Sequence, residues 1–279
     1  MDLKERLEGK LTEEELEHLV TSYDIVGDVA IVKVPEDLEE EKEVIADAVA
    51  EQHPNVRTVL RKTGEREGEY RIADYEFLIG ESAETVHKEH GCRFRLDPTE
   101  VYFSERLGHE RERVVGKAEE DETVIDMFAG VGPFSIEIAR NAGVEEVYAF
   151  ESNPEAFEYL RENVELNKVE ETVETFEGDV RDNLPELKVQ ADRIVMNLPG
   201  SSEEFVELAL DKVREGGTVH YYSFEPKDEL WEDAEEKVLE LFEEHAQKVE
   251  IQDSVVCGHY NPAVERVCFD VAVKKTGRR

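Results

Sequence analysis

A glycine-rich turn follows an apolar strand pattern near the middle of the chain. Residues 126–134 read Asp-Met-Phe-Ala-Gly-Val-Gly-Pro-Phe and connect the apolar run 123–125 to a helical pattern. Gly130 and Gly132 permit a tight turn and a close approach of the backbone to a ligand, and Pro133 suits the first position of a helix. The turn alone is weak evidence, but it indicates a nucleotide-like ligand at the end of a strand.

Polar residues end three further strand patterns. Glu151 ends the run EVYAFE, where an acid can accept hydrogen bonds from both hydroxyls of an adenosine ribose. Asp179, in Gly-Asp-Val, is placed to bind the exocyclic amine of adenine, and Asn197 begins Asn-Leu-Pro. Taken singly, Asp179 could cap a helix and Glu151 could be a surface acid. Together they predict one ligand site, because the carboxyl ends of parallel strands share an edge of the sheet.

S-adenosylmethionine (AdoMet) is the expected ligand, in preference to NAD. The dinucleotide-binding pattern GxGxxG has a third glycine, and Ser135 stands at that position here. AdoMet has no pyrophosphate to bind, so the third glycine is dispensable. The residues that these motifs place at the cofactor are Asp126, Phe128, Gly130, Glu151, Asp179, Asn197 and Pro199.

The segment Asn197-Leu198-Pro199 also bears on the reaction. Many methyltransferases that modify an exocyclic amine carry Asn or Asp, then two prolines and an aromatic residue, at this strand end. Here Leu198 replaces the first proline, and no aromatic residue follows Pro199. The sequence therefore disfavours methylation of an amine and indicates a different acceptor atom.

The elements that would position these residues alternate between strand and helix from residue 123 onwards. This alternation predicts an α/β fold, a Rossmann-like class I methyltransferase domain with a doubly wound, mostly parallel sheet. Residues 248–273 hold a last pair of strand patterns, which we expect to be antiparallel at the sheet edge. We place this catalytic domain at residues 103–279.

The first hundred residues predict a smaller α/β domain, residues 1–102. Residues 1–22 look helical, with Thr12 and Glu15 in a capping-box pattern. An amphipathic helix is expected over 37–52, beginning at an Asp cap. Strand patterns occur over the segments 24–34, 56–60, 72–79 and 93–96.

The composition is strongly acidic. The 279 residues include 70 Asp and Glu against 33 Lys and Arg, a net charge of -37, and the acids are dispersed along the chain. This excludes a generic basic RNA-binding surface and is typical of proteins from a salt-loaded cytoplasm. The three cysteines lack CxxC spacing, so we expect no disulfide framework, no metal site and a reducing cytoplasm. No apolar run is long enough to span a membrane.

Beyond these patterns, most of the chain resembles the archaeal and eukaryotic tRNA (guanine(37)-N(1))-methyltransferases. The resemblance rests on GEYRIADYEFLIGE (68–81), TVHKEHGCRFRLD (85–97), VYFSERLGHERERV (101–114), DMFAGVGPFSIEIA (126–139), MNLPGSSEEFVELAL (196–210) and GGTVHYYSF (216–224). It implies methyl transfer from AdoMet to N1 of guanosine 37 in tRNA, next to the anticodon, with residues 1–102 as the tRNA-recognition domain. We expect a monomer. Family members often begin with an additional domain that binds the outer corner of tRNA, and we expect this chain to lack it.

The resemblance also implies residue roles. Glu110 matches the general base that removes the N1 proton of guanine, which must be lost for methylation at N1. Arg71 matches an arginine that stabilises charge on guanine O6, and Asn197 matches a residue that orients the base. Tyr102 matches an aromatic residue near the target base. The matching AdoMet-contact positions are Arg111, Glu151, Ser152, Asp179 and Val180.

Without the resemblance, the same residues have plainer interpretations. Glu110 lies among Glu105, Glu112, Arg106, Arg111 and Arg113, a pattern typical of a solvated, salt-bridged helix. Arg71 alone would be a surface arginine, and Tyr102 and Phe103 would be core residues.

Positive charge gathers in three windows despite the acidic composition. Residues 57–71, 86–95 and 104–117 each carry a small net positive charge, and they coincide with the motifs of the small domain and the domain junction. We predict that Arg61, Arg93 and Arg113, from these windows, line one RNA-facing groove.

Three alternatives stay open. Related enzymes of wyosine synthesis transfer an aminocarboxypropyl group from AdoMet at the same tRNA position, or methylate a tricyclic intermediate there. The intact Asn197-Leu198-Pro199 and Glu110 favour methyl transfer to guanine. A non-catalytic RNA-binding module is the third alternative, and the pair Arg71 and Glu110 argues against it.

Overall fold

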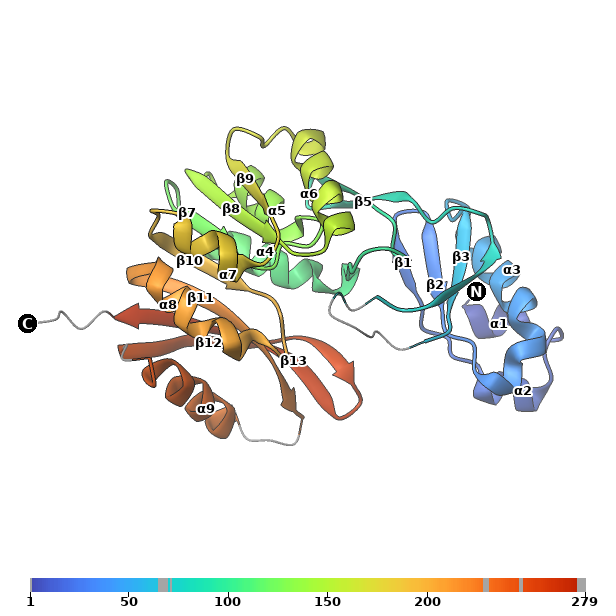
Figure 1. The fold of residues 1–279 in the computed structure, drawn as a ribbon. Helices are drawn as coiled ribbons and strands as arrows, with labels where there is room; N and C mark the ends of the chain where they lie inside the picture. The colour runs from blue at the N-terminus through green and yellow to red at the C-terminus, as the bar shows by residue number, and fades with distance from the viewer. Residues whose placement is uncertain (1, 65–69, 71, 228–230, 246–247, 275–279) are drawn as a thin grey trace, which may run out of the picture. The chain divides into compact units, whose positions relative to one another are not determined.

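The computed structural model describes residues 2–64, 70, 72–227, 231–245 and 248–274. The chain divides into two compact units, Met1–Glu105 and Arg106–Arg279, close to the boundary expected at 102/103. Each unit has its own sheet (Figure 1).

Unit 1 is a four-stranded sheet covered by short helices. Strand β2 is parallel to β3, and the order is β1-β2-β3-β4. A separate antiparallel hairpin, β5–β6, follows. Leu7, Ile45, Val49 and Val59 lie in the apolar core between helices α1 and α3 and the sheet. The elements are α1 (Leu3–Leu7), α2 (Glu13–His18), β1 (Asp24–Val26), β2 (Val29–Val32), α3 (Lys42–Gln52), β3 (Thr58–Lys62), β4 (Tyr75–Ile79), β5 (Thr85–Glu89) and β6 (Cys92–Leu96).

The start of α3 differs from the prediction, whereas the capping box of α2 is confirmed. Thr12 caps α2, with reciprocal hydrogen bonds between its side chain and backbone and those of Glu15. A 3-10 segment, Glu36–Glu41, precedes α3, and Leu38 inside it has non-helical dihedral angles. Asp37 therefore does not cap α3 and pairs instead with His18. Burial of Leu38 in the core is the physical reason for the bend.

Unit 2 has the predicted doubly wound architecture. Its sheet order is β12-β13-β11-β10-β7-β8-β9, and the five strands from β11 to β9 are parallel. The last two strands pair antiparallel at one edge, as predicted. The strands are β7 (Thr123–Asp126), β8 (Glu146–Glu151), β9 (Val173–Glu177), β10 (Ala191–Met196), β11 (Val213–Pro226), β12 (Lys248–Asn261) and β13 (Val264–Lys274).

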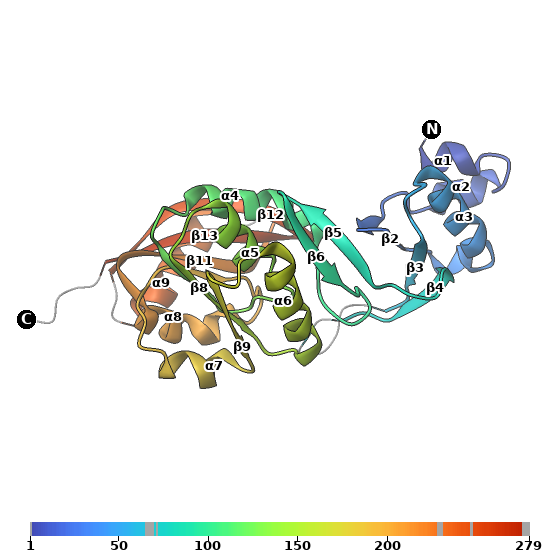
Figure 2. The same cartoon turned by 90° about the horizontal axis from the view of Figure 1, so that it is seen from above.

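Helices cover both faces of this sheet. Helices α4, α5 and α6 lie on one face and α7, α8 and α9 on the other (Figure 2). All six residues of β10 are buried, as expected of a central strand covered on both sides. The helices are α4 (Gly108–Lys117), α5 (Pro133–Asn141), α6 (Pro154–Asn167), α7 (Val180–Asn183), α8 (Val206–Lys212) and α9 (Trp231–Glu243).

Cys92, Cys257 and Cys268 are free thiols. Among the described residues, no helix has both the length and the apolar character required to cross a membrane.

Candidate active site

The glycine-rich turn connects β7 to α5, as predicted, and both glycines have positive φ, 58° at Gly130 and 92° at Gly132. A Cβ atom on Gly132 would lie 2.6 Å from Leu160 Cδ1 and 2.8 Å from Ile136 Cδ1. Gly132 is therefore required by the packing of α5 against α6 as well as by its backbone angle. Its close approach is to protein side chains.

The side chain of Asp126, the last residue of β7, holds this turn by two hydrogen bonds. Its Oδ2 accepts a 2.7 Å hydrogen bond from Ser135 Oγ, and its Oδ1 accepts a longer one from the Phe128 amide. The side chain is 1% exposed, and burial raises its pKa to about 6. The covered carboxylate positions the turn, and the expectation that Asp126 contacts the cofactor stays a prediction.

Glu151 ends β8 beside the turn. One carboxylate oxygen accepts from the Gly130 amide and the other from the Asn153 amide, each at 2.7 Å. Burial raises the pKa of this carboxyl. The Ser152 backbone also bonds this carboxylate, whose two oxygens can accept about four hydrogen bonds in all, so the group retains capacity for a ribose hydroxyl. Ser152, next in the chain, is exposed.

Asp179 caps α7, which was the plainer of its two interpretations. Its Oδ1 accepts from the Arg181 amide at 2.8 Å, and hydrogen bonds from the Arg181 guanidinium lower its pKa. Arg181 also lies over the Phe205 ring, 5.1 Å from its centroid, and Phe205 meets Phe128 edge-on at 4.9 Å. The sequence-based prediction missed Arg181 and Phe205, which connect two predicted cofactor positions. The side chain of the neighbouring Val180 is buried in the core.

Asn197 follows β10 and has an unsatisfied buried atom. Its Oδ1 is buried, and no hydrogen-bond donor reaches it within the part of the chain that the structure describes. The turn that holds it is closed by Ser202 Oγ, which donates to the Leu198 carbonyl at 2.7 Å, and Pro199 is buried. Buried acceptors are nearly always satisfied, so Asn197 fits a ligand that brings a donor.

Glu110 is buried on α4, contrary to the solvated helix that its charged neighbours suggested. It is 3% exposed. Tyr222 Oη donates to its Oε1 at 2.6 Å, and Arg113 donates from Nε to Oε2 at 2.7 Å and from Nη2 to Oε1 at 2.8 Å. Burial raises the pKa of Tyr222 well above its usual value, so its hydroxyl stays a donor. These contacts leave one acceptor position on Oε2.

Arg111 is the second buried charge of α4. It is 1% exposed, and its Nε lies 3.5 Å from Oε1 of the equally buried Glu137 on α5. This ion pair connects the two helices that flank the glycine-rich turn.

Register brings Glu110 and Asn197 to the same part of the sheet. Met196 of β10 pairs with Tyr221 of β11, so Asn197 and Tyr222 are the next residues on neighbouring parallel strands. Because Tyr222 bonds Glu110, the buried carboxylate and the unsatisfied amide oxygen are associated with neighbouring register positions of β10 and β11. Tyr222 lies in the segment GGTVHYYSF (216–224), but no spacing in the sequence connects it to Glu110.

Two of the three predicted RNA-contacting arginines have other contacts. Arg113 bonds Glu110 and Asp270, and the Arg61 side chain, 12% exposed, pairs with Glu39 and Glu76. Both guanidinium groups therefore have carboxylate partners within the protein, and their expected place in an RNA-facing groove stays a prediction.

The other predicted substrate residues lie in or near unit 1. Arg93, on β6, is exposed. Phe103 is a core residue, 6.2 Å from Phe94 between ring centroids, as expected without the resemblance, and Tyr102 is half-buried. Arg71 lies outside the described residues.

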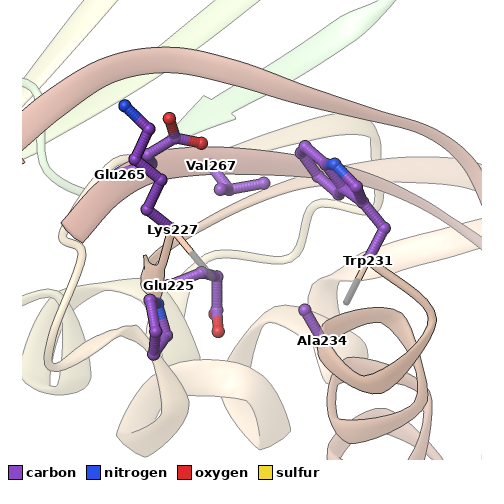
Figure 3. A pocket seen from close by; sticks show the side chains of 7 residues that line it. Glu225, Lys227, Trp231, Ala234, Glu265 and Val267 are labelled. Carbon is purple, nitrogen blue, oxygen red and sulfur yellow. The ribbon is translucent and has the colours of Figure 1, made fainter. Parts of the chain in front are cut away.

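A small pocket lies beyond the end of β11. Side chains of β11, β13 and α9 surround it, including Trp231 and Glu265 (Figure 3). Its volume is about 30 Å³, which is room for about one water molecule. It is therefore too small for AdoMet.

Comparison with protein families matches nearly the whole chain. Residues 85–275 match the TRM5/TYW2 methyltransferase domain, and residues 3–83 match the TYW2 N-terminal domain. The tRNA (guanine(37)-N(1))-methyltransferase Trm5b of Pyrococcus abyssi is 43% identical over 91% of this chain and 76% of its own length. The tRNA(Phe) (4-demethylwyosine(37)-C(7)) aminocarboxypropyltransferase of Pyrococcus horikoshii is 36% identical over 98% of this chain and 97% of its own.

Solved structures agree with this assignment. A complex of aTrm5 and tRNALeu has a TM-score of 0.85 at 35% identity and covers 98% of this chain and 78% of that one. The P. horikoshii TYW2 in complex with MeSAdo has a TM-score of 0.82 at 33% identity, covering 98% of both chains. The chain belongs to the TRM5/TYW2 family of AdoMet-dependent methyltransferases.

Proposed function

We propose that this protein transfers the methyl group of AdoMet to N1 of guanosine 37 in tRNA. The observation that carries the proposal is the register of β10 and β11, in which Asn197 follows β10 next to Tyr222 of β11, and Tyr222 holds the buried Glu110 carboxylate. A base and an unsatisfied acceptor are the groups that a guanine edge, with its N1 and N2 hydrogens, requires.

Bound AdoMet supplies an electrophilic methyl group on its sulfonium. Glu110 accepts the N1 proton at its open Oε2 position while the N1–methyl bond forms and the sulfur–methyl bond breaks, which leaves S-adenosylhomocysteine. Tyr222 and Arg113 hold the carboxylate still during this transfer. Asn197 accepts a hydrogen bond from the base and orients it, and Arg71 stabilises the charge that develops on O6.

The proposed cofactor contacts come from residues at the carboxyl ends of the parallel strands. Glu151 binds the ribose hydroxyls, Asp179 and the backbone at Val180 face the adenine, and Phe128, Gly130, Ser152 and Pro199 complete the site. Arg111 is the least direct of the proposed contacts, because its side chain is buried against Glu137. Tyr102 stacks near the flipped base, and Arg93 contacts the anticodon arm.

The test is Glu110→Gln, which keeps the shape of the side chain and removes the base. Methylation of a tRNA transcript should fall by about a hundredfold or more, the typical contribution of a general base. AdoMet binding by calorimetry should stay unchanged. A tRNA in which G37 is replaced is the substrate control. Full activity in Glu110→Gln would refute the assignment of the base.

A specific observation favours a second candidate, aminocarboxypropyl transfer to a wyosine intermediate at the same position. The N-terminal 3–83 segment matches the TYW2 N-terminal domain, and the P. horikoshii aminocarboxypropyltransferase aligns over nearly its whole length. The by-products separate the two reactions: methyl transfer leaves S-adenosylhomocysteine, whereas aminocarboxypropyl transfer leaves methylthioadenosine. Mass analysis of nucleoside 37, from tRNA with guanosine or with the tricyclic intermediate, identifies the product and detects methylation of the intermediate.

A further inference from the structure

Asp270, on β13, binds the far side of the arginine that holds Glu110. Arg113 Nη1 donates to Asp270 Oδ2 at 2.6 Å, and Nη2 donates to Oδ1 at 3.1 Å. The same guanidinium group donates to both oxygens of Glu110. It therefore lies between two buried carboxylates, those of Glu110 (3% exposed) and Asp270 (1% exposed). Bidentate contacts of this kind fix orientation as well as distance.

Asp270 is itself anchored by two further groups. Lys117 Nζ donates to its Oδ2 at 2.6 Å, and His220 Nδ1 lies 2.6 Å from its Oδ1. His220 Nε2 lies 2.7 Å from Arg193 Nη1, so that nitrogen accepts and Nδ1 carries the proton. Burial lowers the pKa of His220, in agreement with a neutral ring.

We infer that Asp270 is a positioning residue for the proposed methyl transfer, which holds the Arg113 fork against Glu110 and balances its charge. The inference rests on the proposed role of Glu110 as the base. Two acids other than Glu110 face Arg113 and Lys117 in the described structure, the buried Asp270 and the exposed Asp253. Without Asp270, the charges of Arg113 and Lys117 would be offset by Glu110 and by the solvent-screened Asp253 alone, which would disfavour protonation of Glu110.

The groups that face Glu110 or Arg113 come from four elements. Tyr222 comes from β11, Cys257 and Asp253 from β12, Cys268 and Asp270 from β13, and Arg113 and Lys117 from α4 itself. Burial raises the pKa values of both thiols, so they stay neutral. Hydrogen bonds from His220, Arg113 and Lys117 outweigh burial and hold the pKa of Asp270 far below its usual range. Asp270 is therefore the permanent negative charge.

This chain of contacts positions Glu110 and does not conduct protons. A relay from Glu110 to Asp270 would pass through Arg113, and a guanidinium does not give up its proton in proteins. Another cluster on these elements has the residue types of a metal site: the side-chain ligand atoms of His220, Cys268 and Asp270 lie within 4.8 Å of one another. The cationic side chains of Arg193, Arg113 and Lys117 already contact this cluster.

The experiment compares Asp270→Asn with Asp253→Asn. Asp253 also contacts Lys117 at 2.6 Å, and it lies 3.8 Å from Arg113, but its side chain is 42% exposed. Asp270→Asn should lower kcat about tenfold or more, with KM for AdoMet and tRNA unchanged within about twofold, and should move the acidic limb of the kcat–pH profile to lower pH. Asp253→Asn should keep the wild-type kcat and profile.

A merely structural Asp270 would lower thermal stability without moving the pH profile, and that result would overturn the inference. If Asp270→Asn does not fold, Arg113→Lys tests the same contact, because lysine keeps the charge but cannot bind both carboxylates as a fork. Full kcat in Arg113→Lys would also overturn it. The Glu110→Gln measurement distinguishes failure of the proposed function from failure of this inference. If Glu110→Gln is active, Glu110 is not the base. If Glu110→Gln is inactive and Asp270→Asn has the wild-type kcat, only the positioning role of Asp270 is refuted.

Discussion

Ser135 Oγ donates a 2.7 Å hydrogen bond to Oδ2 of Asp126, and the two side chains are 0% and 1% exposed. Ser135 stands where a dinucleotide-binding turn has its third glycine. The serine therefore has a structural role of its own. Its hydroxyl donates to the buried carboxylate at the end of β7 and so connects the start of α5 to this strand.

The raised pKa of Asp126, about 6, makes stability depend on pH. The native state binds this proton more tightly than the unfolded chain, so its stabilisation is complete below the ordinary pKa and is lost as pH rises towards 6. The Asp126→Asn variant has no titrating carboxyl group at this position, so it does not lose this stabilisation as pH rises. Its stability relative to wild type should improve by about 2 kcal/mol between about pH 4 and pH 7, as measured by urea unfolding.

Asp179→Asn is the control for this trend. Hydrogen bonds from Arg181 lower the pKa of Asp179, so its contribution is present above the ordinary pKa and is lost as pH falls. Asp179→Asn should therefore lose stability relative to wild type as pH rises. The same slope in both variants would contradict the buried-proton explanation for Asp126.

Tyr222→Phe should alter the pH dependence of methylation in the opposite direction to Asp270→Asn. The hydroxyl donates a 2.6 Å hydrogen bond to the charged form of Glu110, and its loss favours the neutral form. We expect the acidic limb of the kcat–pH profile to move to higher pH, with AdoMet affinity unchanged. An unmoved limb would mean that this hydrogen bond does not affect the base.

Gly132→Ala should destabilise the protein more than Gly216→Ala. Both glycines have positive φ, 92° and 82°, but a Cβ at Gly132 meets Leu160 and Ile136, whereas one at Gly216 meets nothing within 4 Å. The backbone term is about 1–2 kcal/mol for each, and overpacking adds about 1–3 kcal/mol at Gly132. Urea unfolding of the two variants measures the difference, and equal losses would show that packing is not the cause.

Salt should stabilise the fold because the net charge is -37. Raising KCl from about 0.1 M to about 1 M shortens the Debye length from about 10 Å to about 3 Å, which screens repulsion between exposed acids. We expect the thermal midpoint to rise, and NaCl at equal ionic strength to act similarly if screening is the cause. A midpoint that does not change with KCl would contradict the interpretation of the acidic surface.

Regular sequence patterns predict most of the fold. Strand and helix alternation from Thr123 predicted the parallel sheet, and the Thr12 capping box predicted where α2 begins, because both depend on contacts between residues close in sequence. The 3-10 segment before α3 was missed, since the burial of Leu38 depends on the rest of the core.

The candidate site divides in the same way. The sequence by itself determined the strand-end residues Glu151, Asp179 and Asn197, because a strand that ends at a turn must present its last residues at the sheet edge. Only the tertiary structure decided the contacts of Glu110, because Tyr222 and Asp270 lie more than a hundred residues away and reach it or its arginine through register and helix packing. The packing of α4 also decided that this charged helix is not solvated all round, because it buries the side chains of Glu110 and Arg111 within the protein.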